Sequence, residues 1–254
     1  GVEQMTQNQS QIRVIDRAFS ILFFMARHKE PIGVTDVARN VNLPKATAYR
    51  ILDSLITQRM VTEREGLYEM GPATLFLADA YRSQVAFSEI ARPFLERLNR
   101  ETKETVHLFV FEHGEFFYLD KLESPYQVRM HSRVGVKGSL LHLSAGRALL
   151  SALPQQEVSR ILGDEATPDV FNELEEIRKR GFAIDDEQNE KGLRCVGAVI
   201  LDSYSRPVGG LSVSAPVYRF SYEMIAKYGE TVYQTAQDIG AALLHYERER
   251  KIKK

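Results

Sequence analysis

The stretch Pro31–Val61, PIGVTDVARNVNLPKATAYRILDSLITQRMV, decides the fold of the N-terminal part of the chain. It contains a short apolar stripe within Val34–Val41 and a longer one after it, both with the spacing of one face of a helix. The tight turn Asn42-Leu43 separates them, and Pro44 stands where proline is tolerated, at the first position of a helix. We therefore predict two short helices joined by a tight turn. The longer stripe consists of Ala48, Ile51, Leu52 and Leu55.

The flanking sequence extends this helix pair into a larger motif. An apolar stripe within Ile12–Ala26 predicts another helix on the N-terminal side. After the pair, Met60–Glu63 and Leu67–Met70 have extended character, and Gly66 in the turn between them can adopt a positive φ. Helix, helix, turn, helix and β-hairpin in this order are typical of a winged helix-turn-helix domain, which we place at residues 12–71.

The rest of the chain is predicted to be a linker and a second domain. Residues 72–103 have helical patterns and are interpreted as a helical linker. From residue 104 to 254, strand patterns alternate with short helical ones, which predicts an α+β domain around an antiparallel sheet. The expected strands are Thr105–Phe111, Phe116–Lys121, Val128–Val134, Val196–Asp202 and Val208–Ser214, and the expected helices are Ala145–Ala152, Glu157–Leu162, Val170–Arg180 and Ser221–Arg250.

The composition is that of an ordinary globular protein, with 44% hydrophobic and 26% charged residues. The 33 Lys and Arg balance the 34 Asp and Glu, so a net charge of −1 neither requires nor excludes nucleic acid. A single cysteine excludes an internal disulfide and favours a reducing, cytoplasmic location. No apolar run approaches the ~18–20 residues of a membrane-spanning helix. Residues 1–11 are polar, and we expect a disordered or tag segment there.

The helix after the tight turn carries the side chains that would contact DNA. In a helix-turn-helix, this second helix enters the major groove and its N-terminal residues reach base edges. Lysine and arginine there neutralise phosphates or bind guanine, while alanine and threonine methyls contact thymine. The hairpin is mostly acidic around Arg64, so we expect the helix to supply most contacts. The predicted DNA-binding residues are Thr35, Lys45, Ala46, Thr47, Tyr49, Arg50 and Arg64.

These patterns also have less specific interpretations. Three helices and a hairpin can form a small core or a protein-binding module, and helix spacing alone does not distinguish these from DNA binding. The acidic stretch Asp185–Cys195, DDEQNEKGLRC, could be interpreted as a metal-binding loop. However, it lacks histidines at ligand spacing, and one thiol beside carboxylates is a poor ligand set. The alternative is a solvated loop that leads into a core strand, with Cys195 buried.

An enzyme is the competing functional class. Cys195 as nucleophile, with His142 as base and Asp185 as the orienting group, would form a hydrolase triad. However, GLRCVGAV places the thiol within an apolar strand, where a thiolate is disfavoured. The chain also has no G-x-S-x-G, P-loop or G-x-G-x-x-G motif. We therefore predict no catalytic residue, no metal site and no cofactor.

Several separated stretches resemble one known family, in that family's order. Pro31–Val61 is similar to the DNA-binding half of the IclR family of bacterial transcriptional regulators. HLSAGRALLSALP (142–154), RGFAIDDEQNEKGLRCVGAVI (180–200) and GGLSVSAPVYRFS (209–221) resemble its effector-binding half. Within the family, TKETVHL (102–108), VRMHSRVG (128–135) and EKGLRCVG (190–197) are most similar to the repressors of 2-keto-3-deoxygluconate and pectin catabolism.

This resemblance implies a GAF- or profilin-like domain that binds a small organic acid, such as a keto or sugar acid. By motif, the backbone N–H groups of Ser144 and Ala145 would hold its carboxylate, which suits the start of a helix. Asp185 would favour a ligand with hydroxyls, and Ser214 would donate its hydroxyl. HLSAGRA and LGDEATPDVFNEL are both shorter than in the family. The implied effector-binding residues are Met130, Ser144, Ala145, Gly146, Asp185, Leu193, Cys195 and Ser214.

The two halves together predict a cytoplasmic transcriptional repressor that acts as a homodimer or homotetramer. Two-fold protein symmetry matches a palindromic operator in double-stranded DNA. A small carboxylate would change the spacing of the DNA-binding domains or the oligomer equilibrium, through its differential affinity for the two states. The alternative is a small-molecule sensor that acts through protein partners.

Overall fold

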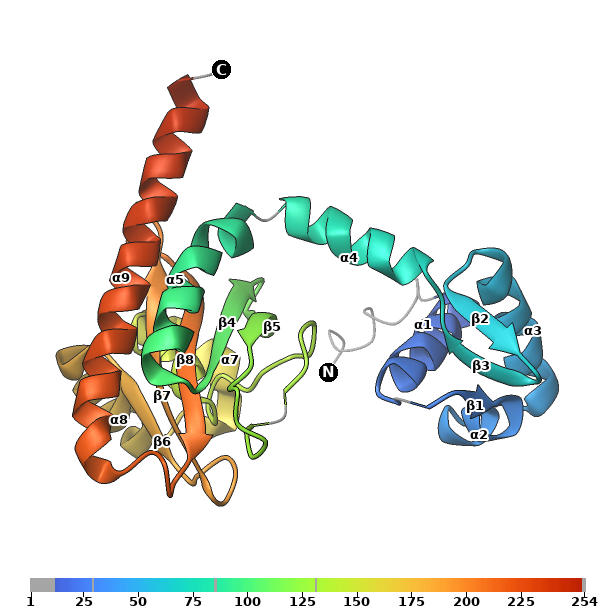
Figure 1. The fold of residues 1–254 in the computed structure, drawn as a ribbon, viewed down its shortest axis with the longest axis horizontal. Coiled ribbons are helices and arrows are strands. Elements are labelled where there is room, and N and C mark those ends of the chain that lie inside the picture. Colours follow the sequence, from blue (N-terminus) through green and yellow to red (C-terminus); the bar gives the residue numbers. More distant parts are fainter. Residues whose placement is uncertain (1–11, 29, 85, 131, 253–254) are drawn as a thin grey trace, which may run out of the picture. The chain divides into compact units, whose positions relative to one another are not determined.

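The chain divides into two compact units, residues 1–84 and 85–254 (Figure 1). The computed structural model describes residues 12–28, 30–84, 86–130 and 132–252. The expected disordered or tag segment 1–11 lies outside the described residues. The boundary between the units falls inside the expected linker 72–103, whose first helix belongs to the N-terminal unit and whose second helix belongs to the C-terminal unit.

The described part of the first unit consists of helices and a small antiparallel sheet, which confirms the winged helix-turn-helix arrangement. The sheet has the strand order β1-β3-β2. The stripe predicted from the sequence is the buried face of α3, where all four of its residues are buried. The elements are α1 (Arg13–Ala26), β1 (Ile32–Gly33), α2 (Val34–Asn40), α3 (Lys45–Thr57), β2 (Val61–Arg64), β3 (Leu67–Met70) and α4 (Ala73–Gln84).

The turn between α2 and α3 is set by three consecutive residues. Asn42 has a φ of 53°, a left-handed conformation that asparagine tolerates better than most residues. The Leu43 N–H then donates to the Ala38 carbonyl at 2.9 Å, which closes the turn. Pro44 is the N-cap of α3, one residue before the first helical position expected for it, and its carbonyl accepts the N–H of Thr47 at 2.9 Å. The turn therefore fixes where α3 begins.

The second unit is built around an antiparallel sheet, and this confirms the expected α+β class. Among the described residues the sheet has five strands in the order β5-β4-β8-β7-β6. The strands are β4 (Thr105–Glu112), β5 (Glu115–Leu122), β6 (Ala183–Asp186), β7 (Leu193–Leu201) and β8 (Pro207–Pro216). The helices are α5 (Ala86–Thr102), α6 (Ser144–Ser151), α7 (Gln155–Leu162), a 3-10 turn (Gly163–Glu165), α8 (Pro168–Arg180) and α9 (Tyr222–Ile252).

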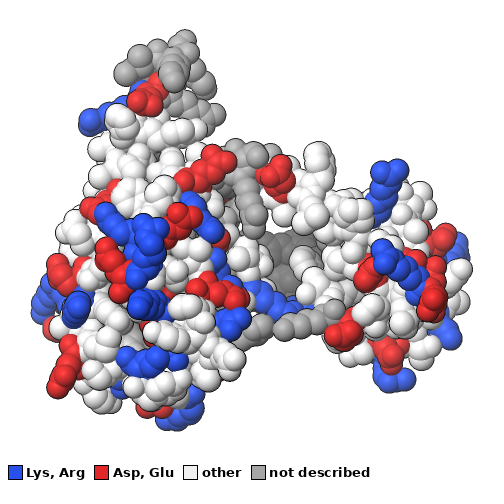
Figure 2. Space-filling model, viewed as in Figure 1, with Lys and Arg blue, Asp and Glu red and all other residues white. Residues whose placement is uncertain are grey.

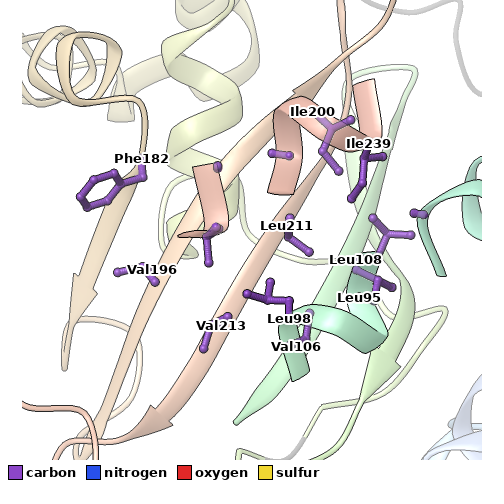
Figure 3. Close-up of a cluster of buried hydrophobic side chains, with 14 of the residues drawn as sticks. Leu95, Leu98, Val106, Leu108, Phe182, Val196, Ile200, Leu211, Val213 and Ile239 are labelled. Atoms are coloured by element: carbon purple, nitrogen blue, oxygen red, sulfur yellow. The ribbon is translucent and has the colours of Figure 1, made fainter. Parts of the chain in front are cut away.

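The two faces of this sheet have different chemistry. On one face, side chains such as Val106, Val196 and Val213 form an apolar core with α5 and α9, shown in Figure 3. On the other face, alternate residues of the same strands point toward α6 and α8, and this second core includes Phe109 and Ala183. The polar side chains that the sequence singled out lie on this second face.

The sequence-based expectation was wrong for two short segments of this unit. The described residues of the predicted strand Val128–Val134 are not in a strand. They belong to a connection that is held to β5 by backbone hydrogen bonds outside the strands. In one of these the Gly135 N–H donates to the Tyr118 carbonyl at 2.7 Å. Strand β6 was not predicted from the sequence. It has only four residues, half of them acidic, and shows no clear alternation of apolar and polar residues.

We predict that Gly197→Ala destabilises the protein by ~1–3 kcal/mol, the usual cost of forcing an extra carbon into a packed core. A Cβ at Gly197 would lie 2.3 Å from the Ala145 backbone nitrogen, so the start of α6 would have to move. Urea unfolding of the full chain measures the change. Gly33→Ala is the control, because its Cβ would lie 4.0 Å from Leu67 and should have a smaller effect. Equal stabilities for the two variants would contradict the close approach of α6 to β7.

Candidate functional site

The predicted DNA-binding side chains lie at the starts of α2 and α3. Lys45, Ala46, Tyr49 and Arg50 are exposed on α3, and Thr47 is half-buried. Thr35 is exposed in the first turn of α2, whose N-cap is Gly33. Because the opposite side of α3 is in the core, these side chains share the surface that the helix can offer to a partner.

The wing contributes little positive charge. Arg64 lies 3.5 Å from the carboxylate of Glu69, and the carboxylate of Glu63 accepts the Gly66 N–H at 2.6 Å within the turn. Figure 2 shows basic and acidic side chains interspersed over the face in view, without one large basic area. The face in view therefore has no broad positive field, and that α3 supplies most of the contacts to phosphates stays a prediction.

One cationic residue near this surface was missed by the sequence reasoning. A groove of about 420 Å³ runs between α1 and α3, and Arg17, Thr47 and Arg50 all contribute to its walls. Arg17 is exposed on α1, a helix that was predicted from its apolar stripe alone. A comparison of the exposed positions of that helix with its buried positions could have identified Arg17 from the sequence.

In the second unit, the strand register aligns polar side chains that are far apart in the sequence. Asp185 of β6 pairs with Cys195 of β7, Cys195 pairs with Ser214 of β8, and Ser214 pairs with Thr105 of β4. Directly paired residues point to the same face of a sheet. All four are at most 5% exposed. We call these residues the polar row.

The start of α6 lies over the same face, beside the polar row. Gly197, two residues after Cys195, is the point of closest approach to Ala145, as described above. Gly146 is required on the other side, since a Cβ there would be 2.5 Å from the Leu140 carbonyl oxygen. Ser144 and Ala145 are buried, and the N–H groups of a first helical turn have no acceptor within their helix. The arrangement places the first N–H groups and the positive end of the helix near buried polar groups.

The segment after β6 is held against α6 by hydrogen bonds. One carboxylate oxygen of Asp185 accepts the N–H groups of Gln188 and Asn189 at 3.0 and 3.2 Å. Arg147 of α6 is 4% exposed and bridges α8, through Glu173 at 2.8 Å, and the Gln188 side chain at 2.6 Å. Asp185 therefore shapes this loop as well as contributing to the polar row.

Comparison with known proteins identifies the family. The family model for the IclR helix-turn-helix domain matches residues 14–65, and the model for the C-terminal region of bacterial IclR transcriptional regulators matches residues 79–241. The chain belongs to the IclR family. The HTH-type transcriptional regulator KdgR of Escherichia coli K12 is 31% identical over 252 residues, covering 91% of this chain and 92% of that protein. The transcriptional repressor IclR of the same strain is 25% identical, covering 91% and 90%.

Solved structures of bacterial proteins have the same fold. The crystal structure of the Thermotoga maritima IclR superposes with a TM-score of 0.77 at 29% sequence identity and covers 92% of this chain and all of that one. A regulator from Rhodococcus sp. RHA1 superposes with a TM-score of 0.79 at 23% identity, covering 93% and 100%. This IclR protein is therefore a DNA-binding transcriptional regulator with an effector-binding C-terminal domain, as its sequence predicted.

The enzymatic alternative does not fit the IclR fold or the chemistry of Cys195. The relatives of this chain are transcriptional regulators, not enzymes. Burial raises the pKa of the Cys195 thiol to about 12, so a nucleophilic thiolate does not form near neutral pH. His142, the residue considered as its base, is exposed. Among the described residues there is no cluster of three or more His, Cys, Asp or Glu that would hold a metal ion, and no helix long and apolar enough to cross a membrane.

The structure brings most of the implied effector residues to one face of the sheet. Asp185, Cys195 and Ser214 lie in the polar row, and Leu193 is two residues from Cys195 on the same side of β7. Met130 is buried in the connection between β5 and α6. The sequence reasoning missed three further polar residues on this face or against it. They are Thr105, His107 and Ser212. Their signal was a pair of polar residues two positions apart, at 105 and 107 in β4 and at 212 and 214 in β8.

His107 is a fully buried titratable group of this face. Its side chain is fully buried on β4, its Nε2 lies 2.8 Å from the Ser132 hydroxyl, and its ring meets Tyr118 edge-on at 5.4 Å. Burial, and to a lesser extent the charge of Lys121, lower the pKa of His107 to about 3. The imidazole is therefore neutral in the folded protein near neutral pH.

We predict that His107 makes the protein less stable in mild acid. The unfolded chain binds a proton near pH 6.5 that the folded chain accepts only near pH 3, so this stability is complete above pH 6.5 and is lost as the pH falls toward 3. The slope for one proton is ~1.4 kcal/mol per pH unit. Urea unfolding between pH 6.5 and 4.5 should show a steeper loss for the wild type than for His107→Gln. The exposed control His142→Gln should keep the wild-type slope, and equal slopes for all three proteins would refute the assignment.

Proposed function

We propose that this chain is a cytoplasmic repressor that binds palindromic DNA as a homodimer or a pair of dimers, and that a small organic acid releases or alters that binding. One observation carries the ligand part: the start of α6, where the first N–H groups have no acceptor within the helix, lies beside a buried polar row. The DNA part is supported by the exposed basic and small polar side chains of α3 on a family-typical helix-turn-helix.

Dimerisation is supported by exposed apolar side chains in the first unit. On α1, Ile15, Phe19 and Phe23 are 47–63% exposed and lie along one face of the helix. On α4, Leu75 and Phe76 are 73% and 74% exposed. Side chains of this size, gathered on two helices, are more typical of a protein interface than of a solvent-exposed surface. A second copy of the chain, related by a two-fold axis, would cover both faces and place two α3 helices on a palindrome.

The ligand is proposed to be a small carboxylic acid, such as a keto or sugar acid. Its carboxylate accepts hydrogen bonds from the first N–H groups of α6, where the helix dipole favours a negative charge. The hydroxyl of Ser214 and the carboxylate of Asp185 then face the rest of the ligand. The acid changes DNA binding only by the difference between its affinities for the two states of the regulator.

Arg50→Ala should weaken DNA binding about tenfold or more and reduce the slope of log affinity against log salt by about one, because one phosphate or guanine contact is removed. The duplex is selected from a random library with the wild-type protein, and an inverted repeat in the selected sequences is the outcome expected for a dimer. Arg160→Ala, an equally exposed arginine in the second unit, is the matched control. Wild-type affinity and salt slope for Arg50→Ala would exclude this residue from the interface.

Ser214→Ala should weaken binding of the acid by about tenfold while DNA affinity stays unchanged, because a buried hydroxyl facing the ligand is lost. A thermal-shift screen with pyruvate, glyoxylate, galacturonate and 2-keto-3-deoxygluconate identifies an acid, since a ligand at 100 times its Kd adds ~2.7 kcal/mol of stability. Ser151→Ala is the control, a buried serine whose hydroxyl bonds to Ala148 within α6. An acid that stabilises Ser214→Ala as much as the wild type binds elsewhere.

A further inference from the structure

Tyr118 is a buried tyrosine on β5, outside the polar row. It is 8% exposed and belongs to the core on the α6 side of the sheet. Its phenol hydroxyl forms no hydrogen bond with any residue in the described part of the chain. An unpaired polar group in low-dielectric surroundings costs free energy, and a bound molecule with a hydrogen-bond acceptor would remove that cost. The hydroxyl is therefore a candidate ligand contact.

The ring of Tyr118 leans from β5 over β4, in the direction of the polar row. Tyr118 pairs directly with Phe109 of β4, and their ring centroids are 4.5 Å apart. The same ring meets His107 edge-on, with the centroids 5.4 Å apart. His107 lies between Phe109 and Thr105 along β4, and Thr105 belongs to the polar row. The contacts of the ring thus lead from its own strand toward the polar row.

The electrostatics of the phenol place its hydroxyl on the same side. Burial, and to a lesser extent the charges of Cys195 and Glu190, raise the pKa of Tyr118 to about 12. Cys195 is in the polar row on β7, and Glu190 is in the loop after β6. Since charge interactions weaken with distance, the hydroxyl lies toward these groups across the sheet. The phenol is neutral near pH 7, so it keeps its proton to donate.

The hydroxyl remains open to a small molecule. Within residues 12–28, 30–84, 86–130 and 132–252, one buried side-chain nitrogen or oxygen atom is sealed from solvent without a hydrogen bond, and it is Nε of Arg147. The Tyr118 hydroxyl also has no hydrogen bond, but it does not share this condition, so a water-sized molecule reaches it. The phenol therefore faces accessible space and not a closed part of the core.

The start of α6 lies across the same part of the sheet. A Cβ at Gly210 of β8 would be 3.1 Å from the Cβ of Ala145, so α6 packs directly on this glycine. Gly210 pairs with Phe109, which in turn pairs with Tyr118. Neighbouring strands are ~4.8 Å apart, so the backbones of β5 and β8 are ~10 Å apart here, and the ring of Tyr118 covers part of that distance. A small acid bound at the start of α6 would lie beside the phenol.

We propose that Tyr118 is an effector-binding residue, whose phenol hydroxyl donates a hydrogen bond to an oxygen atom of the acid other than the carboxylate oxygens. This inference rests on the proposed function, in which the carboxylate binds at the start of α6. It narrows the ligand class to acids with a further oxygen atom, such as a keto or hydroxyl group. An unsubstituted acid leaves the phenol unpaired, which costs binding free energy.

The test removes a single oxygen atom from the full-length chain. Tyr118→Phe lacks the hydroxyl but keeps the ring against Phe109 and His107. The matched control is Tyr228→Phe, because Tyr228 is also 8% exposed but lies on α9, in the apolar core on the opposite face of the sheet. Calorimetry gives the Kd of pyruvate, galacturonate and 2-keto-3-deoxygluconate, and of propionate and hexanoate, which have no oxygen beyond the carboxylate.

Ultraviolet difference spectroscopy reports on the phenol itself. The chain contains no tryptophan, so tyrosine dominates its near-ultraviolet absorption. A new hydrogen bond from a phenol shifts the tyrosine band. The oxygenated acid that binds most tightly should produce this shift in the wild type and in Tyr228→Phe, and most of the shift should be lost in Tyr118→Phe.

The affinities should change selectively. Tyr118→Phe should bind that oxygenated acid about tenfold more weakly than the wild type, because one hydrogen bond to the ligand is lost. Propionate and hexanoate should bind Tyr118→Phe and the wild type equally, and Tyr228→Phe should match the wild type throughout. If the hydroxyl only supports the fold, oxygenated and unsubstituted acids would weaken alike and the difference spectrum would persist, and this result would overturn the proposal.

Other outcomes separate this inference from the function on which it rests. If acids bind in a way that depends on Ser214 but not on Tyr118, the effector site stands and the role of Tyr118 is wrong. If the wild type binds propionate or hexanoate as tightly as the oxygenated acids, the role of Tyr118 is also wrong. If no acid of the panel binds the wild type, the effector site and the inference both fall.

Discussion

The antiparallel register of β4, β8, β7 and β6 is the constraint on which the C-terminal unit depends. Because side chains alternate with a period of two, a single register gives each strand an apolar side for α5 and α9 and a polar side for α6. A shift of one residue would move Cys195 and Ser214 into the apolar core and Val196 and Val213 toward α6. The packing of the apolar face therefore also fixes the positions of the polar groups.

Two titratable groups of this polar face are buried without charge. His107 and Cys195 are both titratable, and desolvation keeps both of them neutral near pH 7. The same low-dielectric surroundings strengthen a hydrogen bond to a bound molecule and make an unpaired polar group expensive. Such a face suits selective recognition of a small polar ligand. It does not suit nucleophilic catalysis, which needs an activated group.

The sequence predicted the elements with strong periodicity and missed those whose position depends on distant partners. The stripe of α3 and the turn at Asn42 follow from local rules, so the helices and hairpin of the first unit could be predicted from the sequence. Strand β6 is short, and the segment around Ser132 is positioned by contacts with β4 and β5 that no local pattern encodes. The family resemblance supplied Asp185 and Ser214, whereas the position of His107 opposite Ser212 became visible only when the strands were paired.

The contacts of Arg147 have a mechanical consequence for the segments that they join. A buried guanidinium that loses one partner leaves an uncompensated charge in the core, which is strongly unfavourable. Arg147 of α6 contacts Glu173 of α8, the carbonyl of Ile184 in β6 and the Gln188 side chain, and so joins three elements that meet around one side chain. A displacement at the start of α6 would carry α8 and the loop after β6 with it. These parts of the domain would then move together rather than one by one.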